Sequence, residues 1–325
     1  MDAFTKMKKV AGSFSACGST RTVLGLIGHT PLVPLNFQPE GVTLQVKCEF
    51  LNPSGSIKDR LAKGVLLDAE RRGWLRPDSV ILECSSGNTG IALSMVGAVM
   101  GYKVMILMSE SASVERRRLI RQLGAELVLF QSQGQYQTGI ELSRQMAAKD
   151  PRYFLTRQFE NPLNVKDHEE GTGQEILQQV GGPIDAFVSG FGTGGTLAGC
   201  VKAIKQRWPK ARIVAMEPAE RALLAGECPC CHAIEGVADG FMPDLLKDMP
   251  FEGSLKIKSA DAMAMTRRLH REFGLLVGTS SGANVVAALQ FAQELKPGAT
   301  IVTVLCDRAE RYFSTPLFPQ GLGVV

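Results

Sequence analysis

One pattern recurs along the chain: a short apolar, β-branched run, then a turn of small residues, then a helical segment. Ser79–Glu83 precedes Ile91–Met100 in this way, and Lys103–Met108 precedes Val114–Leu123. Further strand or strand-and-helix segments are Ala125–Phe130, Ala186–Ser189 before Leu197–Gln206, Arg212–Met216 and Thr300–Cys306. Strands that alternate with helices are typical of parallel sheets covered by helices. The pattern therefore predicts an α/β fold with one or two doubly wound parallel sheets.

The length favours two lobes, because 325 residues exceed what one hydrophobic core usually serves. We place a boundary near residue 155, with a smaller lobe at residues 50–155 and a larger lobe formed by residues 1–49 and 156–325. Leu32–Pro34 and Val42–Glu49 look like strands that could belong to either lobe. The expected fold is two doubly wound lobes with twisted, mostly parallel sheets.

Charge and hydropathy narrow the classes of function. The formal net charge is only +4 and the longest basic run is Arg116–Arg118, so nucleic-acid binding is not expected. The apolar stretch Ile91–Met108 is interrupted by Gly97, Gly101 and Lys103, which favours a buried helix and strand over a membrane span. Eight scattered cysteines do not form a disulfide framework, and the N-terminal stretch is too rich in Gly and Ser for a secretory signal. We expect a protein of a reducing, cytoplasmic compartment.

The segment Asn52–Arg60 is turn-forming and leads into the helical pattern Leu61–Glu70, which puts Lys58 near a helix N-terminus. The helix dipole and open N–H groups there disfavour a positive charge, so they should lower the lysine pKa and favour a nucleophilic amine. Taken alone, Lys58 is better explained as a surface lysine in a capping turn.

Two strand-to-helix turns suit anions. Ser85–Gly90 consists of small and hydroxyl residues whose open N–H groups suit a carboxylate, and the Asn88 amide could bond a phenolic oxygen. Gly190–Thr196 has the glycines and threonines of a phosphate-binding loop. It lacks the Gly-Lys-Ser/Thr of a P-loop and the spacing of a dinucleotide fingerprint, so the phosphate belongs to something other than NTP or NAD.

A fourth segment, Gly278–Asn284, precedes the small-residue helix Val285–Leu295 and could by itself be a simple helix cap. Together the four segments resemble the tryptophan-synthase-β-like, or fold type II, family of pyridoxal-phosphate enzymes, and within it the cysteine synthases (O-acetylserine sulfhydrylases). The resemblance covers nearly the whole chain, through Gly28–Leu32, Asn52–Arg60, Ser86–Gly90, Gly192–Thr196, Thr279–Ala283 and Arg311–Thr315. The ending Cys306–Tyr312 looks more like the B-type (CysM-like) cysteine synthases.

The resemblance implies a cofactor, pyridoxal 5'-phosphate (PLP), in a cleft between the two lobes. Lys58 would carry it as a Schiff base and serve as the catalytic base, with Asn88 at its 3-hydroxyl and Ser280 at its pyridine nitrogen. The residues implied for its phosphate are Gly192, Thr193, Gly194, Gly195 and Thr196. Those implied for the substrate are Ser85, Ser86, Asn88, Thr89, Gln158 and Gly236.

The implied activity is β-replacement on O-acetyl-L-serine or O-phosphoserine, with sulfide or thiosulfate as donor. It would yield L-cysteine or S-sulfocysteine through an aminoacrylate intermediate. Other enzymes of the same fold stay open: a cystathionine β-synthase-like enzyme, a serine or threonine dehydratase, or a diaminopropionate synthase. A different class, an inactive binding module, also stays open. The resemblance implies a homodimer and a serine acetyltransferase partner.

Two cysteine features stand apart. The cluster Cys228, Cys230, Cys231 and His232 is compatible with a plain loop, with thiol redox chemistry or with metal binding. It lacks the second Cys-x-x-Cys pair of a closed zinc site, so we expect no metal. Cys306 could help a sulfur donor to bind, or it could be a buried cysteine at a strand end.

Overall fold

The computed structural model describes residues 22–37, 42–131, 136–224, 232–247 and 249–318. The larger of its two sheets has the strand order β1-β2-β10-β7-β8-β9. The strands are β1 (Leu32–Leu35), β2 (Val42–Cys48), β7 (Ala186–Gly190), β8 (Arg212–Pro218), β9 (Ser254–Ile257) and β10 (Ala299–Leu305). β1 pairs with β2 antiparallel, and the other pairings in this sheet are parallel.

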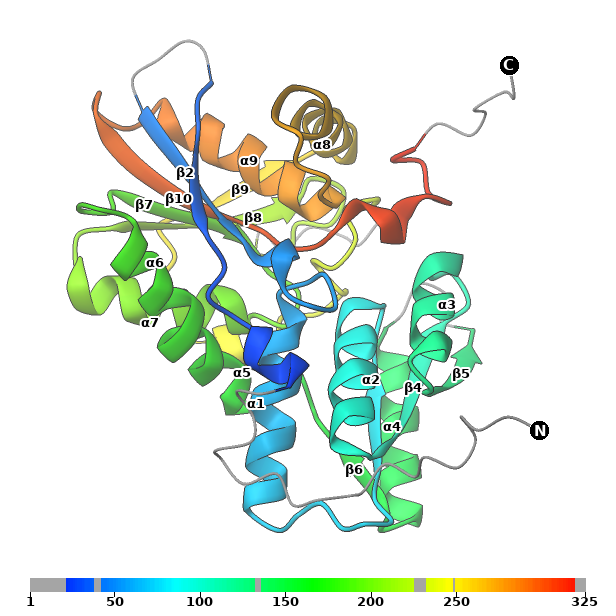
Figure 1. Ribbon diagram of the computed structural model, residues 1–325. Helices are drawn as coiled ribbons and strands as arrows, with labels where there is room; N and C mark the ends of the chain where they lie inside the picture. Colours follow the sequence, from blue (N-terminus) through cyan, green and yellow to red (C-terminus); the bar gives the residue numbers. More distant parts are fainter. Residues whose placement is uncertain (1–21, 38–41, 132–135, 225–231, 248, 319–325) are drawn as a thin grey trace.

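Helices cover both faces of the larger sheet (Figure 1). They are α6 (Gln174–Gln179) and α7 (Gly195–Arg207) on one side, and α8 (Ser259–Phe273) and α9 (Thr279–Ala292) on the other. Neighbouring strand residues point to opposite faces, so Phe187 packs in the core cluster under α7 while Val188 packs in the cluster under α9. Strands that are buried on both faces explain the continuous apolar runs in the sequence.

The smaller sheet has the order β5-β4-β3-β6 and is wholly parallel. Its strands are β3 (Val80–Cys84), β4 (Lys103–Ser109), β5 (Glu126–Phe130) and β6 (Tyr153–Leu155). The core on one face includes residues of α1 (Lys58–Arg71), α2 (Asn88–Met100) and α3 (Val114–Gln122), and α4 (Gln137–Lys149) packs on the other. A short helix α5 (Pro162–Asp167) and a π-helical turn, η5 (His168–Gly173), contact α7.

Short 3-10 turns complete the described chain: η3 (Val23–Leu26), η4 (Glu49–Leu51), η6 (Asp244–Leu246) and η7 (Ala309–Tyr312). The predicted α/β class with mostly parallel sheets is confirmed. The strands of the smaller sheet lie between residues 80 and 155, and those of the larger sheet lie outside that range. The lobe boundaries themselves stay a prediction. Leu24 and Ile27, assigned to the larger lobe, pack in the core cluster of α1 and α2.

The most apolar stretch of the sequence, Ile91–Met108, forms most of α2 and then β4, as predicted. The turn between them is made at Gly101, which has a positive φ of 86° and caps α2. None of the described helices is long and apolar enough to span a membrane.

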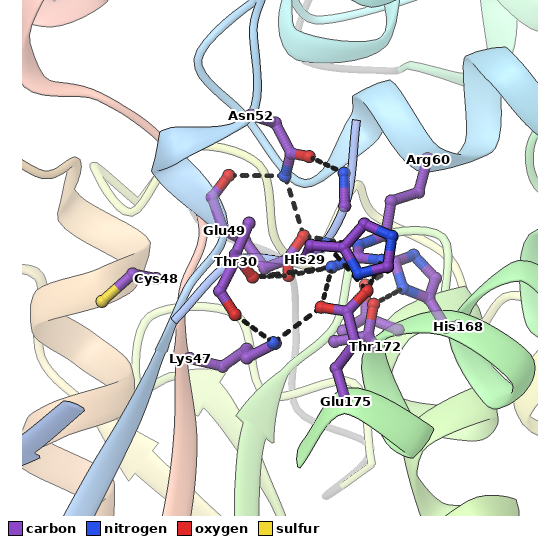
Figure 2. A network of polar contacts seen from close by, with 12 residues as sticks. His29, Thr30, Lys47, Cys48, Glu49, Asn52, Arg60, His168, Thr172 and Glu175 are labelled. Carbon is purple, nitrogen blue, oxygen red and sulfur yellow. Dashed lines mark hydrogen bonds and ion pairs between the residues drawn. The ribbon is translucent and has the colours of Figure 1, made fainter. Parts of the chain in front are cut away.

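A buried network of charges fixes the first turns of α1 (Figure 2). The Arg60 guanidinium donates to Glu49 at 2.7 and 2.8 Å and to Glu175 at 2.8 Å. Lys47 of β2 also donates to Glu175, at 2.7 Å. The network therefore connects β2, η4 and α6 to α1 two residues after Lys58.

The same network holds the segment that enters β1. The N–H of His29 donates to Glu175 at 2.9 Å and that of Gly28 donates to the side chain of Asn52 at 2.9 Å. Burial alone would raise the pKa of Glu175, but the hydrogen bonds and positive charge of Arg60 hold it well below its usual range. The Glu175 carboxylate thus stays ionised because the buried Arg60 cation faces it.

Replacing Arg60 with Met should destabilise the fold strongly, because it leaves the Glu49 and Glu175 carboxylates buried without their main partner. We expect a loss of about 3–5 kcal/mol in the free energy of unfolding. Urea unfolding followed by circular dichroism measures it. Arg152→Met is the control, since its ion pair with Asp150 is exposed and should matter little. Equal losses in the two variants would contradict this role of the network.

Candidate active site

Lys58 is the first residue of α1, and the loop before it is held by the chain that follows β10. The N–H of Ile57 donates to the carbonyl of Cys306 at 2.9 Å, and the N–H of Arg308 donates to that of Gly55 at 3.1 Å. Arg311 adds a bond of 2.7 Å to the carbonyl of Ser54. Segments far apart in the sequence, up to 257 residues for Ser54 and Arg311, therefore fix the position of Lys58.

Lys58 lines a pocket between the carboxyl ends of the strands of the two sheets. Burial lowers the pKa of its amine, although nearby acidic groups partly oppose the shift. The sequence prediction of a lowered pKa thus has the right direction, but its main cause is removal from water rather than the helix dipole. A neutral amine in such a pocket can act as a nucleophile and as a base.

The loop after β3 presents the N-terminus of α2 to the same pocket, which Ser86, Asn88 and Thr89 line. Ser85 has another task, because its hydroxyl accepts from the N–H of Gly87 at 3.0 Å and from that of Gly90 at 2.9 Å. Ser85 is buried beneath the loop and does not line the pocket. Its side chain fixes the loop that the substrate is expected to meet.

Gln158, in the turn after β6, lines the pocket beside this loop. Its side-chain carbonyl accepts from the Thr89 hydroxyl at 2.6 Å, and its amide donates to the carbonyl of Cys84 at 2.7 Å. Gln158 therefore holds the loop after β3 in place, while a second N–H of its amide is left for a ligand.

Asn88 contacts the segment that follows β10. Its amide donates to Asp307 at 2.7 Å, and its side-chain carbonyl accepts from Arg311 at 2.5 Å. Asp307 also accepts a bond of 2.6 Å from the Tyr312 hydroxyl. The polar end of Asn88 is thus oriented by groups that follow β10.

The glycine-rich loop between β7 and α7 lines the opposite side of the pocket with Gly192, Thr193, Gly194 and Thr196. No side chain caps α7, and in the described chain none of the N–H groups of residues 192–196 donates to a backbone carbonyl. A side chain at Gly192 would come within 2.6 Å of the carbonyl oxygen of Gly236, so the loop needs glycine there. Open N–H groups at a helix N-terminus suit a phosphate.

Two residues that the sequence did not single out orient the threonines of this loop. Asn164 donates to the Thr193 hydroxyl at 2.9 Å, and His168 lies 3.2 Å from the Thr196 hydroxyl. Burial lowers the pKa of His168 well below its usual range, so the ring is neutral. His168 begins the π-helical turn η5, a distortion that is frequent at functional sites. Gly195 does not line the pocket, because it packs against Asn164.

Ser280 and Cys306 form a third wall, at the start of α9 and the end of β10. Asn284 donates weakly to the Cys306 sulfur at 3.7 Å. Burial raises the pKa of the Cys306 thiol to about 12, so it stays protonated at neutral pH. Gly236, in the loop after β8, completes the predicted residues that line the pocket.

Several pocket residues have no sequence signal of their own, among them Arg116, Tyr136, Phe159 and Asp239. They lie outside the small-residue turns, in helices or loops that the fold brings to the strand ends.

Cys228, Cys230 and Cys231 lie outside the described residues. His232 is described, and its ring accepts from the N–H of Ile234 at 3.3 Å, while burial lowers its pKa. Across the described ranges, no three His, Cys, Asp or Glu side chains are grouped as metal ligands would be.

Nearly the whole chain is similar to proteins of known activity. A curated cysteine synthase from Staphylococcus aureus is 44% identical over 296 residues, which cover 90% of this chain and 95% of that protein. The solved O-acetylserine dependent cystathionine beta-synthase from Helicobacter pylori superposes with a TM-score of 0.89 at 34% identity, covering 92% of this chain and 98% of that one. A solved O-ureido-L-serine synthase gives a TM-score of 0.88 at 42% identity, covering 92% and 96%.

A family model described as pyridoxal-phosphate dependent enzyme matches residues 23–307, a range that holds Lys58 and both anion-binding loops. This chain belongs to the family of pyridoxal-phosphate dependent enzymes.

Proposed function

We propose that this chain is a cysteine synthase, a PLP-dependent transferase that replaces the β-substituent of O-acetyl-L-serine with sulfur to give L-cysteine. The observation that carries the proposal is the position of Lys58, which lies in one pocket between a phosphate-type loop and a carboxylate-type loop. The curated relative from Staphylococcus aureus is named cysteine synthase. The solved neighbour from Helicobacter pylori is described as dependent on O-acetylserine.

The pocket fits the cofactor chemically. Open N–H groups and the two hydroxyls of the loop 192–196 suit its phosphate, and a helix N-terminus adds a favourable dipole. Asn88 retains one amide N–H for the ring hydroxyl, and Ser280 offers a hydroxyl to the ring nitrogen. When bound, PLP supplies an electron sink for bonds at the α-carbon of an amino acid.

Lys58 has two tasks in this proposal. Its amine is the attachment point for the cofactor, and once substrate displaces it, its Nζ accepts the α-proton. Burial favours the neutral amine that both tasks need. Ser280, unlike a carboxylate, does not hold the ring nitrogen protonated, which favours elimination at the β-carbon over transamination.

The substrate carboxylate is assigned to the N-terminus of α2. The N–H groups of Ser86, Asn88 and Thr89 lie at the start of this 13-residue helix, where a negative charge is stabilised. Gln158 holds the Thr89 hydroxyl and can add a further N–H to the carboxylate. Ser85 supports the loop from below.

We also propose a B-type enzyme, because of the ending Cys306–Tyr312, together with a homodimer, a serine acetyltransferase partner and cytoplasmic residence. Because the Cys306 thiol stays protonated, it offers a sulfur donor a neutral contact rather than a charge. A donor-binding role for Cys306 is therefore one of shape and weak hydrogen bonding.

Rival reactions use the same lysine chemistry: cystathionine β-synthesis, dehydration of serine or threonine, and diaminopropionate synthesis. An inactive binding module would not need Lys58 in a pocket that lowers its pKa. Identifying the product distinguishes these reactions, because each uses the same kind of pocket but gives a different product.

Purified enzyme loaded with PLP should convert O-acetyl-L-serine and sulfide to L-cysteine, measured by chromatography. Parallel reactions contain serine with homocysteine, serine or threonine alone, and O-acetyl-L-serine with ammonia. Lys58→Ala should abolish cysteine formation, whereas Lys63→Ala, in the same helix but outside the pocket, should retain it. Faster formation of cystathionine, a keto acid or diaminopropionate would replace the proposal with the matching rival.

Replacing Thr196 with Val should weaken binding of PLP, because it removes a hydroxyl that His168 orients within the phosphate loop. Loss of one hydrogen bond to a charged group predicts a dissociation constant roughly 10- to 100-fold higher. Fluorescence titration of the apoenzyme with PLP measures it. Thr43→Val, at an exposed position near the start of β2, should leave the constant unchanged. An unchanged constant in Thr196→Val would remove Thr196 from the phosphate site.

A further inference from the structure

Asn164, in α5, lies behind the Lys58 pocket and contacts two of its sides. The residue is fully buried and does not line the pocket itself. Its amide nitrogen Nδ2 lies 2.9 Å from the carbonyl oxygen of Gln158 and 2.9 Å from the Thr193 hydroxyl. Gln158 belongs to the proposed site for the substrate carboxylate, and Thr193 belongs to the proposed site for the cofactor phosphate. One buried amide therefore contacts both sites.

The hydrogen bond to Gln158 fixes which way the Asn164 amide faces. A backbone carbonyl can only accept, so the atom beside it must be the amide nitrogen. The second N–H of that nitrogen then donates to the Thr193 hydroxyl. Because the hydroxyl oxygen accepts this bond, its own proton remains to be donated to a phosphate oxygen in the pocket. Asn164 thus sets the direction in which the Thr193 hydroxyl donates.

The carbonyl oxygen of the Asn164 amide lies against Gly195, the first residue of α7. Any side chain at Gly195 would collide with this amide. Within the described residues, no group donates a hydrogen bond to the Asn164 carbonyl oxygen. Glycine at position 195 therefore makes room for Asn164 beneath the N-terminus of α7, which explains a loop glycine that does not line the pocket.

The turn that carries Gln158 needs support from its surroundings. Arg157, just before it, has a positive φ of 55°, which is rare for a residue with a side chain. The N–H of Gln158 donates to the buried Glu83 carboxylate at 3.1 Å, and its carbonyl accepts from Asn164. Both polar groups of the Gln158 backbone are thus held, so its side chain stays beside Thr89.

We infer that Asn164 is a positioning residue for two ligands: it directs the Thr193 hydroxyl toward the cofactor phosphate and holds Gln158 at the substrate carboxylate. This inference rests on the proposed function and adds to it a residue that acts on cofactor and substrate without touching either. Because one amide serves both sites, its loss should weaken both. Loss of a group that contacts one ligand should weaken only that one.

The test replaces Asn164 with Ala in the full chain and measures two constants. Fluorescence titration of the apoenzyme gives the dissociation constant of PLP, which should rise about tenfold. The KM for O-acetyl-L-serine, measured at saturating PLP and sulfide, should also rise about tenfold. The kcat should change by less than about threefold, because the carboxylate contact is made in both the ground state and the transition state.

Asn161→Ala is the matched control, three residues earlier at the N-cap of α5. Its side chain also takes part in two hydrogen bonds, with the N–H of Leu163 and with the carbonyl of Thr156, and it does not line the pocket. Both variants should lower the temperature of thermal unfolding, because each loses two hydrogen bonds. Asn161→Ala should nevertheless leave the PLP dissociation constant and the KM within about twofold of the wild type.

A second substitution, Thr193→Val, shows whether Asn164 acts on the cofactor through the Thr193 hydroxyl. This variant should raise the PLP dissociation constant and leave the KM near the wild-type value. Adding Asn164→Ala should then raise the PLP constant by less than about threefold more, because the hydroxyl is already absent, and should still raise the KM about tenfold. A role in overall stability alone would give the same factors in both backgrounds.

Asn164→Ser covers a failure of Asn164→Ala to fold. Its single hydroxyl can donate to only one of the two partners, so at least one constant should rise. The inference is overturned if neither constant rises in the folded serine variant, if only one rises in Asn164→Ala, or if Asn161→Ala raises both equally. Failure of the proposed function looks different: the wild type would bind PLP but form no cysteine from O-acetyl-L-serine and sulfide, and the PLP constants would still decide whether Asn164 acts through Thr193.

Discussion

The site depends on one buried guanidinium, that of Arg60, held between the carboxylates of Glu49 and Glu175. Lys58 is two residues earlier in the same helix. The ion pairs that hold Arg60 therefore also fix the first turn of α1, both along the helix axis and in its rotation about that axis. A lysine that carries a cofactor and then moves a proton needs a backbone that is held in one position. The charges are buried at some cost, but each has a partner, and the arrangement connects α1 to both β2 and α6.

Around this fixed helix, the parallel topology brings the reactive loops together. The segments after β3 and β7 begin α2 and α7, so two helix N-termini face the same pocket from different sheets. The segment after β10 completes the site, since Asp307 and Arg311 both bond Asn88. Ligand sites at the carboxyl ends of parallel strands are the expected outcome of this architecture. The two anion sites and the lysine are thus consequences of strand order as much as of local sequence.

Much of this was predictable from the sequence, because strand-to-helix turns of Gly, Ser, Thr and Asn are local signals. Lys58, Asn88 and the loop 192–196 stand in such turns, and resemblance to a family supplied their roles. Ser85 and Gly195 share those turns but support the loops instead of lining the pocket, a difference that depends on which way each residue faces. Asp239, Arg116 and His168 gave no local signal. They reach the site only through packing between segments far apart in the chain, which no single window of sequence records.

The central claim is that Lys58 holds PLP in this pocket. Borohydride reduction of the PLP-loaded protein, followed by proteolysis and mass spectrometry, locates the lysine that carries the cofactor. The account predicts a phosphopyridoxyl group on the peptide that contains Lys58, and its absence from the Lys58→Ala variant. Label on another lysine, or an unlabelled wild-type protein, would contradict it.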